Sequence, residues 1–407
     1  MTRARERRRP RIGFLRLDVS PEERPSTYWL LLGVLSVLLM IGLVMVLSAS
    51  SVQSLAEFGT TWFYFLRQLM WVVLGVVVFL VSSRIDYRVL RRLSTLLLLA
   101  SIAMLVLVLV PGIGVRVNGA RSWIGAGMFR IQPAEVAKLA LVLFCSDLLA
   151  RRAHRIDEAR LTLWPIIVVV SVVGGLMMLQ PDLGGSIVLA AIVFAVLFVA
   201  GVPMLRLAGV LGVGGALAMG AAMAEPYRRA RLLAFLHPER DPGGAAYQIN
   251  QSLNGLASGG WFGAGLGESA SKYGYLPNAH TDFIFAIIGE ELGLFGALLV
   301  VALFLGFGVL GMKAALRAPD LFGMLVAAGI TAWVLAQALV NIGGVVGLMP
   351  ITGITLPFVS YGGSSLLITM AAAGVLVNVA AHGRSRAARP VAKRSPAHPV
   401  MRPAPAR

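Results

Sequence analysis

Long apolar segments alternate with short polar ones along most of the chain. A helix that crosses the hydrocarbon core of a membrane needs about 20 mostly apolar residues. Runs near that length lie at 28–49, 62–83, 94–111, 131–150, 162–180, 184–201, 205–223, 283–311, 321–347 and 356–381. The pattern predicts an all-α membrane protein, a polytopic bundle of about ten transmembrane helices.

The charges in the short connections predict the orientation of this bundle. Alternate connections are basic: SSRIDYRVLRR, RRAHRIDEAR, MKAALRAPD and the turn that holds Arg206. Of the opposite connections, SVQSLAEFGTTW and LQPDLGG contain no Lys or Arg. Because short basic loops stay in the cytoplasm, we expect both termini to be cytoplasmic, which requires an even number of helices.

Composition supports a membrane protein and narrows its class. Of 407 residues, 57% are hydrophobic and 14% charged, and the mean hydropathy is +0.81. The net charge of +17 lies mainly in the tails and short loops, so we expect no nucleic-acid partner. The predicted domains are basic, disordered cytoplasmic tails at 1–26 and 383–407 around a transmembrane domain at 27–382. The single cysteine, Cys145, excludes an intrachain disulfide.

Two segments depart from a simple bundle. About sixty residues, 224–282, separate the seventh and eighth runs and are rich in Gly, Ser, Asn and aromatic residues. Loops of that length are usually functional, so we expect a folded, partly re-entrant exterior lid before helix 8. The stretch NIGGVVGLMPITGITLPFVSYGGSS predicts a broken or re-entrant segment, which is tolerated in a membrane only where protein or water satisfies its backbone.

Asp282 is the leading candidate for chemistry. It stands where the lid meets the eighth apolar run, directly after His280 and Thr281. One interpretation is an N-cap of the helix that follows; the other is a functional carboxylate, because acids at membrane depth are costly. Glu290 and Glu291 lie further along the same run, and at about 100° per residue the three carboxylates cannot all face one site.

The fourth run begins RIQPAEVAK, which places Arg130, Glu135 and Lys138 in or beside the membrane. Glu135 and Lys138 are three residues apart on one helix face. They form either a neutralised pair or, with Arg130, the lining of a site for an anionic headgroup such as a pyrophosphate. In QPDLGG, Asp182 is expected to cap the sixth helix or to support the site.

Together these segments resemble the SEDS family of bacterial cell-wall glycosyltransferases, from about residue 27 to 382. The resemblance rests on LVMVLSASS, FLRQ, NGARSWI, RIQPAEVAK, QPDLGG, YQINQSL, KYGYLPNAHTDFIFAIIGEELG and PITGITLPFVSYGGSS. The motifs look more like the division branch of the family than the elongation branch. One departure is Asn278, where relatives commonly carry Glu.

The resemblance implies a peptidoglycan glycosyltransferase of the bacterial cytoplasmic membrane that polymerises lipid II at the septum. The active site would face the exterior, with Asp282 as the general base. Implied partners are a class B penicillin-binding protein and other divisome proteins. The resemblance also implies that a divalent cation, Mg or Mn, would assist the reaction and that no organic cofactor is needed. The implied substrate-binding residues are Arg130, Lys138, Lys272, His280, Ser360 and Ser364, and the supporting residues are Glu135, Asp182, Gln132, Glu290, Pro357 and Gly362.

Two other functions fit part of the sequence. A lipid II flippase or transporter would use the broken segment and the intramembrane charges. A non-catalytic divisome scaffold would only recruit a transpeptidase, and would leave Asp282 and the lid without a role.

Overall fold

The computed structural model describes residues 24–117, 120–127, 129–237 and 246–383. The tails predicted at 1–26 and 383–407 lie almost wholly outside the described residues. Each of the ten apolar runs corresponds to a helix in the described part of the chain: α1 (Ser26–Phe58), α2 (Phe63–Arg84), α3 (Tyr87–Leu107), α4 (Pro133–Arg151), α5 (Ala159–Leu179), α6 (Leu183–Val199), α7 (Met204–Ala224), α10 (Ile284–Leu316), α11 (Leu321–Val345) and α12 (Gly363–Ala381).

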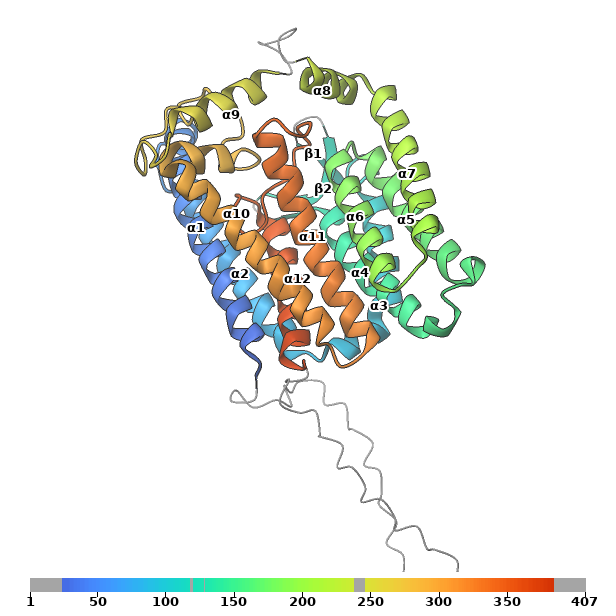
Figure 1. Ribbon diagram of the computed structural model, residues 1–407. Helices are drawn as coiled ribbons and strands as arrows, with labels where there is room; N and C mark the ends of the chain where they lie inside the picture. Colours follow the sequence, from blue (N-terminus) through green and yellow to red (C-terminus); the bar gives the residue numbers. More distant parts are fainter. Residues whose placement is uncertain (1–23, 118–119, 128, 238–245, 384–407) are drawn as a thin grey trace, which may run out of the picture.

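These helices form the predicted polytopic bundle (Figure 1). By length and hydropathy α1, α2, α3, α5, α10, α11 and α12 are candidate membrane spans, and α6 and most of α7 are shorter apolar helices. The remaining helix, α4, carries Glu135, Lys138 and Asp147 within its length, which lowers its hydropathy. The all-α membrane fold is therefore confirmed.

Three predicted helix boundaries were wrong by seven residues or more. The first helix ends at Phe58, not at 49. The third helix begins at Tyr87, not at 94, because Asp86 caps it by accepting a hydrogen bond from the Arg88 N–H at 2.9 Å. The last helix begins at Gly363, not at 356. Pro357 cannot donate a backbone hydrogen bond, and Phe358 has a φ of 64°, which interrupts any helix there.

A small sheet between α3 and α4 was not predicted. Strands β1 (Gly114–Val117), β2 (Ala120–Ala126) and β3 (Phe129–Ile131) pair antiparallel in that order. The sequence did contain a signal for it, since Asn-Gly between alternating residues in VRVNGARSW is typical of a hairpin.

The exterior segment is folded, as expected. It contains α8 (Pro226–Leu236) and α9 (Tyr247–Ser258), and Figure 1 shows them at one end of the bundle, between α7 and α10. A short 3₁₀ helix, Ala153–Arg155, joins α4 to α5 at the opposite end.

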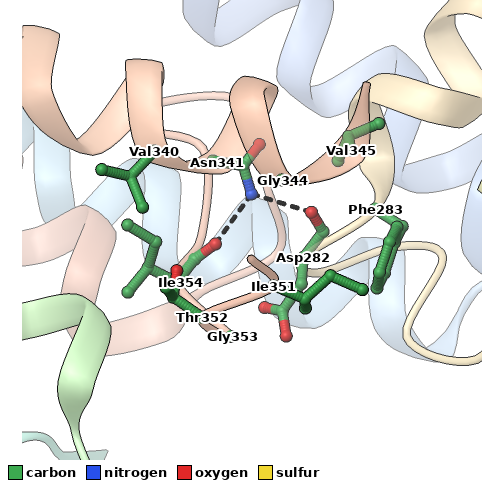
Figure 2. A pocket seen from close by; sticks show the side chains of 10 residues that line it. All are labelled: Asp282, Phe283, Val340, Asn341, Gly344, Val345, Ile351, Thr352, Gly353 and Ile354. Atoms are coloured by element: carbon green, nitrogen blue, oxygen red, sulfur yellow. Dashed lines mark hydrogen bonds between the residues drawn. The ribbon is translucent and has the colours of Figure 1, made fainter. Parts of the chain in front are cut away.

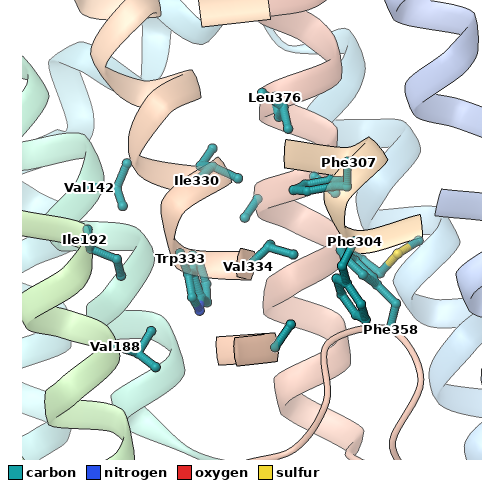
Figure 3. Packing of buried hydrophobic residues seen from close by; sticks show 14 of the residues in the cluster. Val142, Val188, Ile192, Phe304, Phe307, Ile330, Trp333, Val334, Phe358 and Leu376 are labelled. Carbon is teal, nitrogen blue, oxygen red and sulfur yellow. The ribbon is translucent and has the colours of Figure 1, made fainter. Parts of the chain in front are cut away.

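The core of the bundle lies around α11 and α12. Their most apolar stretches are 72% and 83% buried, against 28–33% for the other candidate spans. In Figure 3, Trp333 of α11 lies among side chains of α4, α6, α10 and α12. α1 packs on this core because Gly42 has no side chain: a Cβ there would lie 2.6 Å from the Phe358 carbonyl oxygen.

Both ends of the bundle domain lie on one side. Arg317, just after α10, donates to the Thr27 hydroxyl at the start of α1. The same arginine lies 3.5 Å from the position of a Cβ on Gly383, just after α12. An even number of crossings places the two ends together in this way.

Candidate functional site

Asp282 lies at the mouth of α10 and does not cap it. The helix begins at Ile284, its N-cap residue is Phe283, and no side chain caps its first turn. The capping interpretation of Asp282 is therefore wrong, and its carboxylate is available for another role.

The backbone around Asp282 is fixed by hydrogen bonds from a distant part of the chain. Three successive carbonyls accept them: His280 from the Tyr361 N–H at 3.0 Å, Thr281 from the Ser360 hydroxyl at 2.6 Å, and Asp282 from the Asn341 amide at 2.8 Å. Because the main chain is held at all three positions, the direction of the Asp282 side chain is set by the α11–α12 region.

The carboxylate of Asp282 points into a small recess (Figure 2). The recess encloses about 10 Å³, room for about one water molecule. Its walls are Asp282, Phe283, Val340, Asn341, Gly344, Val345 and the segment 351–354. The Asn341 amide also donates to the Ile354 carbonyl at 2.7 Å, which joins this segment to Asp282.

Sequence reasoning missed Arg231 of α8, a cation that lies beside this recess. Its guanidinium donates to the Ile351 carbonyl at 3.3 Å. One guanidinium nitrogen and one Asp282 oxygen each lie 3.7 Å from the position that a Cβ on Gly353 would take. Arg231 and Asp282 thus both approach Gly353, and the exterior helix α8 contributes to the site.

Burial raises the pKa of the Asp282 carboxyl to about 6, and the positive charge of Arg231 opposes the shift. Such a group is ionised at neutral pH yet basic enough to accept a proton, as a general base requires. Burial also lowers the pKa of His280 to about 4, so this imidazole is neutral. The His280 ring contacts the rings of Tyr64 and Tyr361, at 4.8 and 5.4 Å between centroids, and these two rings also contact each other at 5.4 Å.

Lys138 belongs to a buried polar network on α4 and α11. Its ammonium forms an ion pair with Glu135 at 2.8 Å, donates to the Gln337 side-chain oxygen at 2.9 Å and lies 5.2 Å from the Trp333 ring centroid. Gln337 donates in turn to the Thr355 carbonyl at 3.1 Å. The neutralised pair is present, and Gln337 connects it to the segment that lines the Asp282 recess.

Asp182 caps α6, as one of its two interpretations predicted. Its carboxylate accepts from the Gly185 N–H at 2.8 Å. At Gly184 a Cβ would come within 2.8 Å of the Thr352 side chain, so the start of α6 packs against the recess segment. Asp182 therefore supports the site by fixing this helix end.

Other predicted residues hold the surrounding backbone. Ser364 is fully buried and accepts from the Gln132 N–H at 3.1 Å. The Ser360 hydroxyl accepts from the Leu356 N–H at 2.8 Å in addition to its bond to Thr281. Gly362 donates its N–H to Gln68 at 3.4 Å, and Pro357 lies buried in the same turn. In this structure both serine hydroxyls bind protein groups.

Arg130 lies in β3, directly before α4. It is half-buried, and within the described part of the chain its Nε has no hydrogen-bond partner. It therefore retains donor capacity for an anion.

Glu290, Glu291 and Lys272 lie together, away from the residues that line the Asp282 recess. Glu290 accepts from the Ser269 hydroxyl at 2.6 Å and the Ala270 N–H at 2.9 Å. Glu291 accepts from Ser48 and forms an ion pair with Lys272 at 3.5 Å. The two glutamates fasten the lid to α10 and α1, which explains why they lie inside an apolar run.

Three residues of the site, Arg231, Gln337 and Asn341, were missed. A signal existed for two of them, because Gln337 and Asn341 stand four residues apart in the apolar run QALVN and so share a helix face. Arg231 had no such signal, since the exterior segment holds several arginines.

The comparisons with known proteins agree with this architecture. Residues 28–385 match the FtsW/RodA/SpoVE family model, described as cell cycle protein. Stage V sporulation protein E of Bacillus subtilis is 43% identical over 358 residues, 87% of this chain and 97% of that protein. A probable peptidoglycan glycosyltransferase FtsW of Mycobacterium tuberculosis is 42% identical over 360 residues, 88% of this chain and 69% of the relative.

Solved structures are similar over nearly the same length. One chain of a structure on polymerization and crosslinking by a peptidoglycan synthase complex has a TM-score of 0.71 and 31% identity, over 89% of this chain and 98% of that one. The rod shape determining protein RodA of Thermus thermophilus has a TM-score of 0.65 and 29% identity, over 89% and 97%. The chain therefore belongs to the FtsW/RodA/SpoVE family of cell cycle proteins, the SEDS family that its motifs resemble.

Proposed function

We propose that this protein is a peptidoglycan glycosyltransferase that polymerises lipid II, with Asp282 as the general base. The observation that carries the proposal is the position of the Asp282 carboxyl in a recess at the mouth of α10, where burial raises its pKa to about 6. Relatives at about 42% identity are named peptidoglycan glycosyltransferases.

The proposed reaction joins the 4-hydroxyl of one lipid-linked sugar to C1 of another and expels undecaprenyl pyrophosphate. Asp282 takes the hydroxyl proton as the new C–O bond forms, and the C1–O bond to the pyrophosphate breaks. A pyrophosphate leaves without protonation by a strong acid, so a single carboxylate suffices, in contrast to the carboxylate pair of glycoside hydrolases. Inversion at C1 gives a β-1,4-linked glycan.

The cations near the site have different capacities to hold the pyrophosphate. Arg130 retains donor capacity, and Arg231 lies, like Asp282, close to the position of a Cβ on Gly353. Lys138 and Lys272 are paired with Glu135 and Glu291. In our proposal Arg130 and Arg231 hold the leaving group. Lys138 stays bound to Glu135, and Lys272 contributes only when substrate displaces Glu291.

The divalent cation of the proposal is Mg or Mn, bound together with the substrate. Among the described residues no three His, Cys, Asp or Glu side chains converge to hold a metal ion. Mg²⁺ is commonly bound by carboxylates plus substrate phosphates, and the pyrophosphate would supply phosphate oxygens here, since Asp282 is assigned to the hydroxyl proton. Such an ion neutralises the negative charge of the leaving group.

The proposed setting is the bacterial cytoplasmic membrane at the septum, with both termini in the cytoplasm and the Asp282 recess facing the exterior. The side that holds Thr27 and Gly383 also carries Arg88, Arg91 and Arg151, in agreement with the positive-inside rule. The proposed partner is a class B penicillin-binding protein, and one similar structure is a peptidoglycan synthase complex.

The test is polymerisation of labelled lipid II by the purified protein together with its cognate transpeptidase. We expect Asp282→Asn to lower the rate by about 10²–10⁴-fold, the usual contribution of a general base. Asp157→Asn is the matched control, an exposed carboxylate in the α4–α5 connection. A folded Asp282→Asn variant with wild-type glycan ladders would refute the mechanism. If the wild type forms no glycan ladders but translocates lipid II, a flippase is favoured. If the wild type shows neither activity, a scaffold is favoured.

A further inference from the structure

A second cavity lies at the other end of the bundle from Asp282. It encloses about 420 Å³ and is lined by Arg88, Arg91, Arg92, Arg151, Asp320 and Phe322; we call it the arginine pocket. It lies between the start of α3, the end of α4 and the start of α11. The Tyr87 ring, next to the pocket, is 5.9 Å from the His382 ring, so the pocket is on the side that holds the chain ends.

The carboxylates at the arginine pocket already bind protein groups through ion pairs and hydrogen bonds. Asp320 pairs with Arg88 at 3.2 Å and accepts from the Tyr87 hydroxyl at 2.6 Å and the Gly323 N–H at 2.8 Å. These partners lower the pKa of Asp320 against the effect of its burial, so it remains ionised.

The second carboxylate, Asp147, lies beneath the pocket. It pairs with Arg91 and with Arg151, each at 2.8 Å. Four guanidinium groups therefore face Asp320, Asp147 and the nearby Asp86, whose charge also acts on Arg88, which leaves a surplus of one positive charge. Within the described part of the chain no ion pair is found for Arg92, which is exposed at the rim.

An apolar track leads from the pocket along α3. Arg88, Arg92, Leu96 and Leu99 are spaced at i, i+4, i+8 and i+11, so they share one helix face. Leu96 and Leu99 are 64% and 59% exposed, and on a membrane span such residues contact lipid. The charged pocket and the apolar track together have the form of a headgroup site with a path for acyl chains.

We infer that the arginine pocket binds the phosphate of an anionic phospholipid, with the acyl chains along Leu96 and Leu99. Guanidinium groups match the geometry of phosphate oxygens and can bind them in bidentate fashion. Basic pockets between transmembrane helices at the cytoplasmic side suit anionic headgroups. A free phosphate ion would use the same arginines but would gain nothing from the apolar track, so the lipid is the better occupant.

The test measures lipid retention by the delipidated, purified full chain in native mass spectrometry, titrated with phosphatidylglycerol or with zwitterionic phosphatidylcholine. At about 1 kcal/mol for each basic residue near anionic lipid, Arg92→Gln should weaken phosphatidylglycerol binding about fivefold. Arg88→Gln/Arg92→Gln should weaken it about 25-fold on the same basis. Arg160→Gln, an exposed arginine at the start of α5, should bind as the wild type does, and phosphatidylcholine should show no dependence on any variant.

Two results would overturn the inference. Equal phosphatidylglycerol binding by wild type and Arg92→Gln would place the lipid elsewhere. Displacement of the lipid by millimolar inorganic phosphate would identify a free-anion site instead. Arg92→Gln keeps the test valid even if the double variant unfolds, because it breaks none of the ion pairs found in the described part of the chain.

Discussion

The buried Lys138–Glu135 pair offers a test that separates structural support from substrate binding. Replacing Lys138 by Met keeps an unbranched side chain, one heavy atom shorter, and removes its charge. Glu135 then stays buried, with 6% of its surface exposed, and one of its oxygens already lacks a hydrogen-bond partner. Removal of one partner from a buried ion pair typically costs about 3–5 kcal/mol, so we expect Lys138→Met to lose that much stability.

The double variant Lys138→Met/Glu135→Gln removes the charge of both partners. Replacing a buried pair by well-packed hydrophobic residues of similar volume is often neutral or stabilising. Because the double variant leaves no uncompensated buried charge, it should regain most of the stability that Lys138→Met loses. Gln337 loses the lysine donor but keeps the Trp333 indole N–H at 2.9 Å. The bond from Gln337 to Thr355, and with it the recess segment, should therefore survive.

Two assays on the same preparations decide the role of Lys138. Denaturant unfolding gives the stability, and lipid II polymerisation gives the activity. The ammonium is already bound to Glu135 and Gln337, so we expect the double variant to recover both properties. A stable double variant that forms no glycan would refute this reasoning and would show that the Lys138 charge acts on the substrate.

Three further predictions concern the recess and its support. Polymerisation should be constant above about pH 7, half-maximal near pH 6 and fall towards tenfold per unit at lower pH, because protonation of Asp282, with a pKa of about 6, removes the base. A flat rate down to pH 5 would exclude Asp282 as the base. Asn341→Leu removes the side chain that donates to the Asp282 and Ile354 carbonyls and should lower the unfolding free energy by about 2 kcal/mol. An unchanged unfolding free energy would show that these two hydrogen bonds do not hold the recess. Gly42→Ala should destabilise the protein by about 1–3 kcal/mol, because its Cβ would meet the Phe358 carbonyl. The matched control Gly33→Ala, with open space around it, should lose nothing, and equal stability of the two variants would refute the close packing of α1.

Several features of the protein follow from its sequence alone. In a membrane, backbone groups must be satisfied within each segment, so apolar runs of sufficient length become helices wherever they occur. That local requirement is why the ten runs each correspond to a helix. Asp282 could be singled out for a similar reason, since a carboxylate beside a membrane span is costly and few such groups occur.

Helix ends were less predictable, because they depend on single side chains and not on the apolar pattern. Asp86 extends α3 by about two turns beyond the hydrophobic run, and Phe358, with its positive φ, delays the start of α12. Both effects are too small to register in the hydropathy of a twenty-residue window.

Only the tertiary structure decided which distant residues meet. Arg231 reaches the Ile351 carbonyl across 120 positions of sequence, and Lys272 from the lid finds Glu291 on α10. Hydropathy carries no information about these pairs, because a contact between separate helices depends on how the helices pack. The distinction between Asp282, with its raised pKa beside a recess, and Glu290, bound to backbone amides, follows from packing for the same reason.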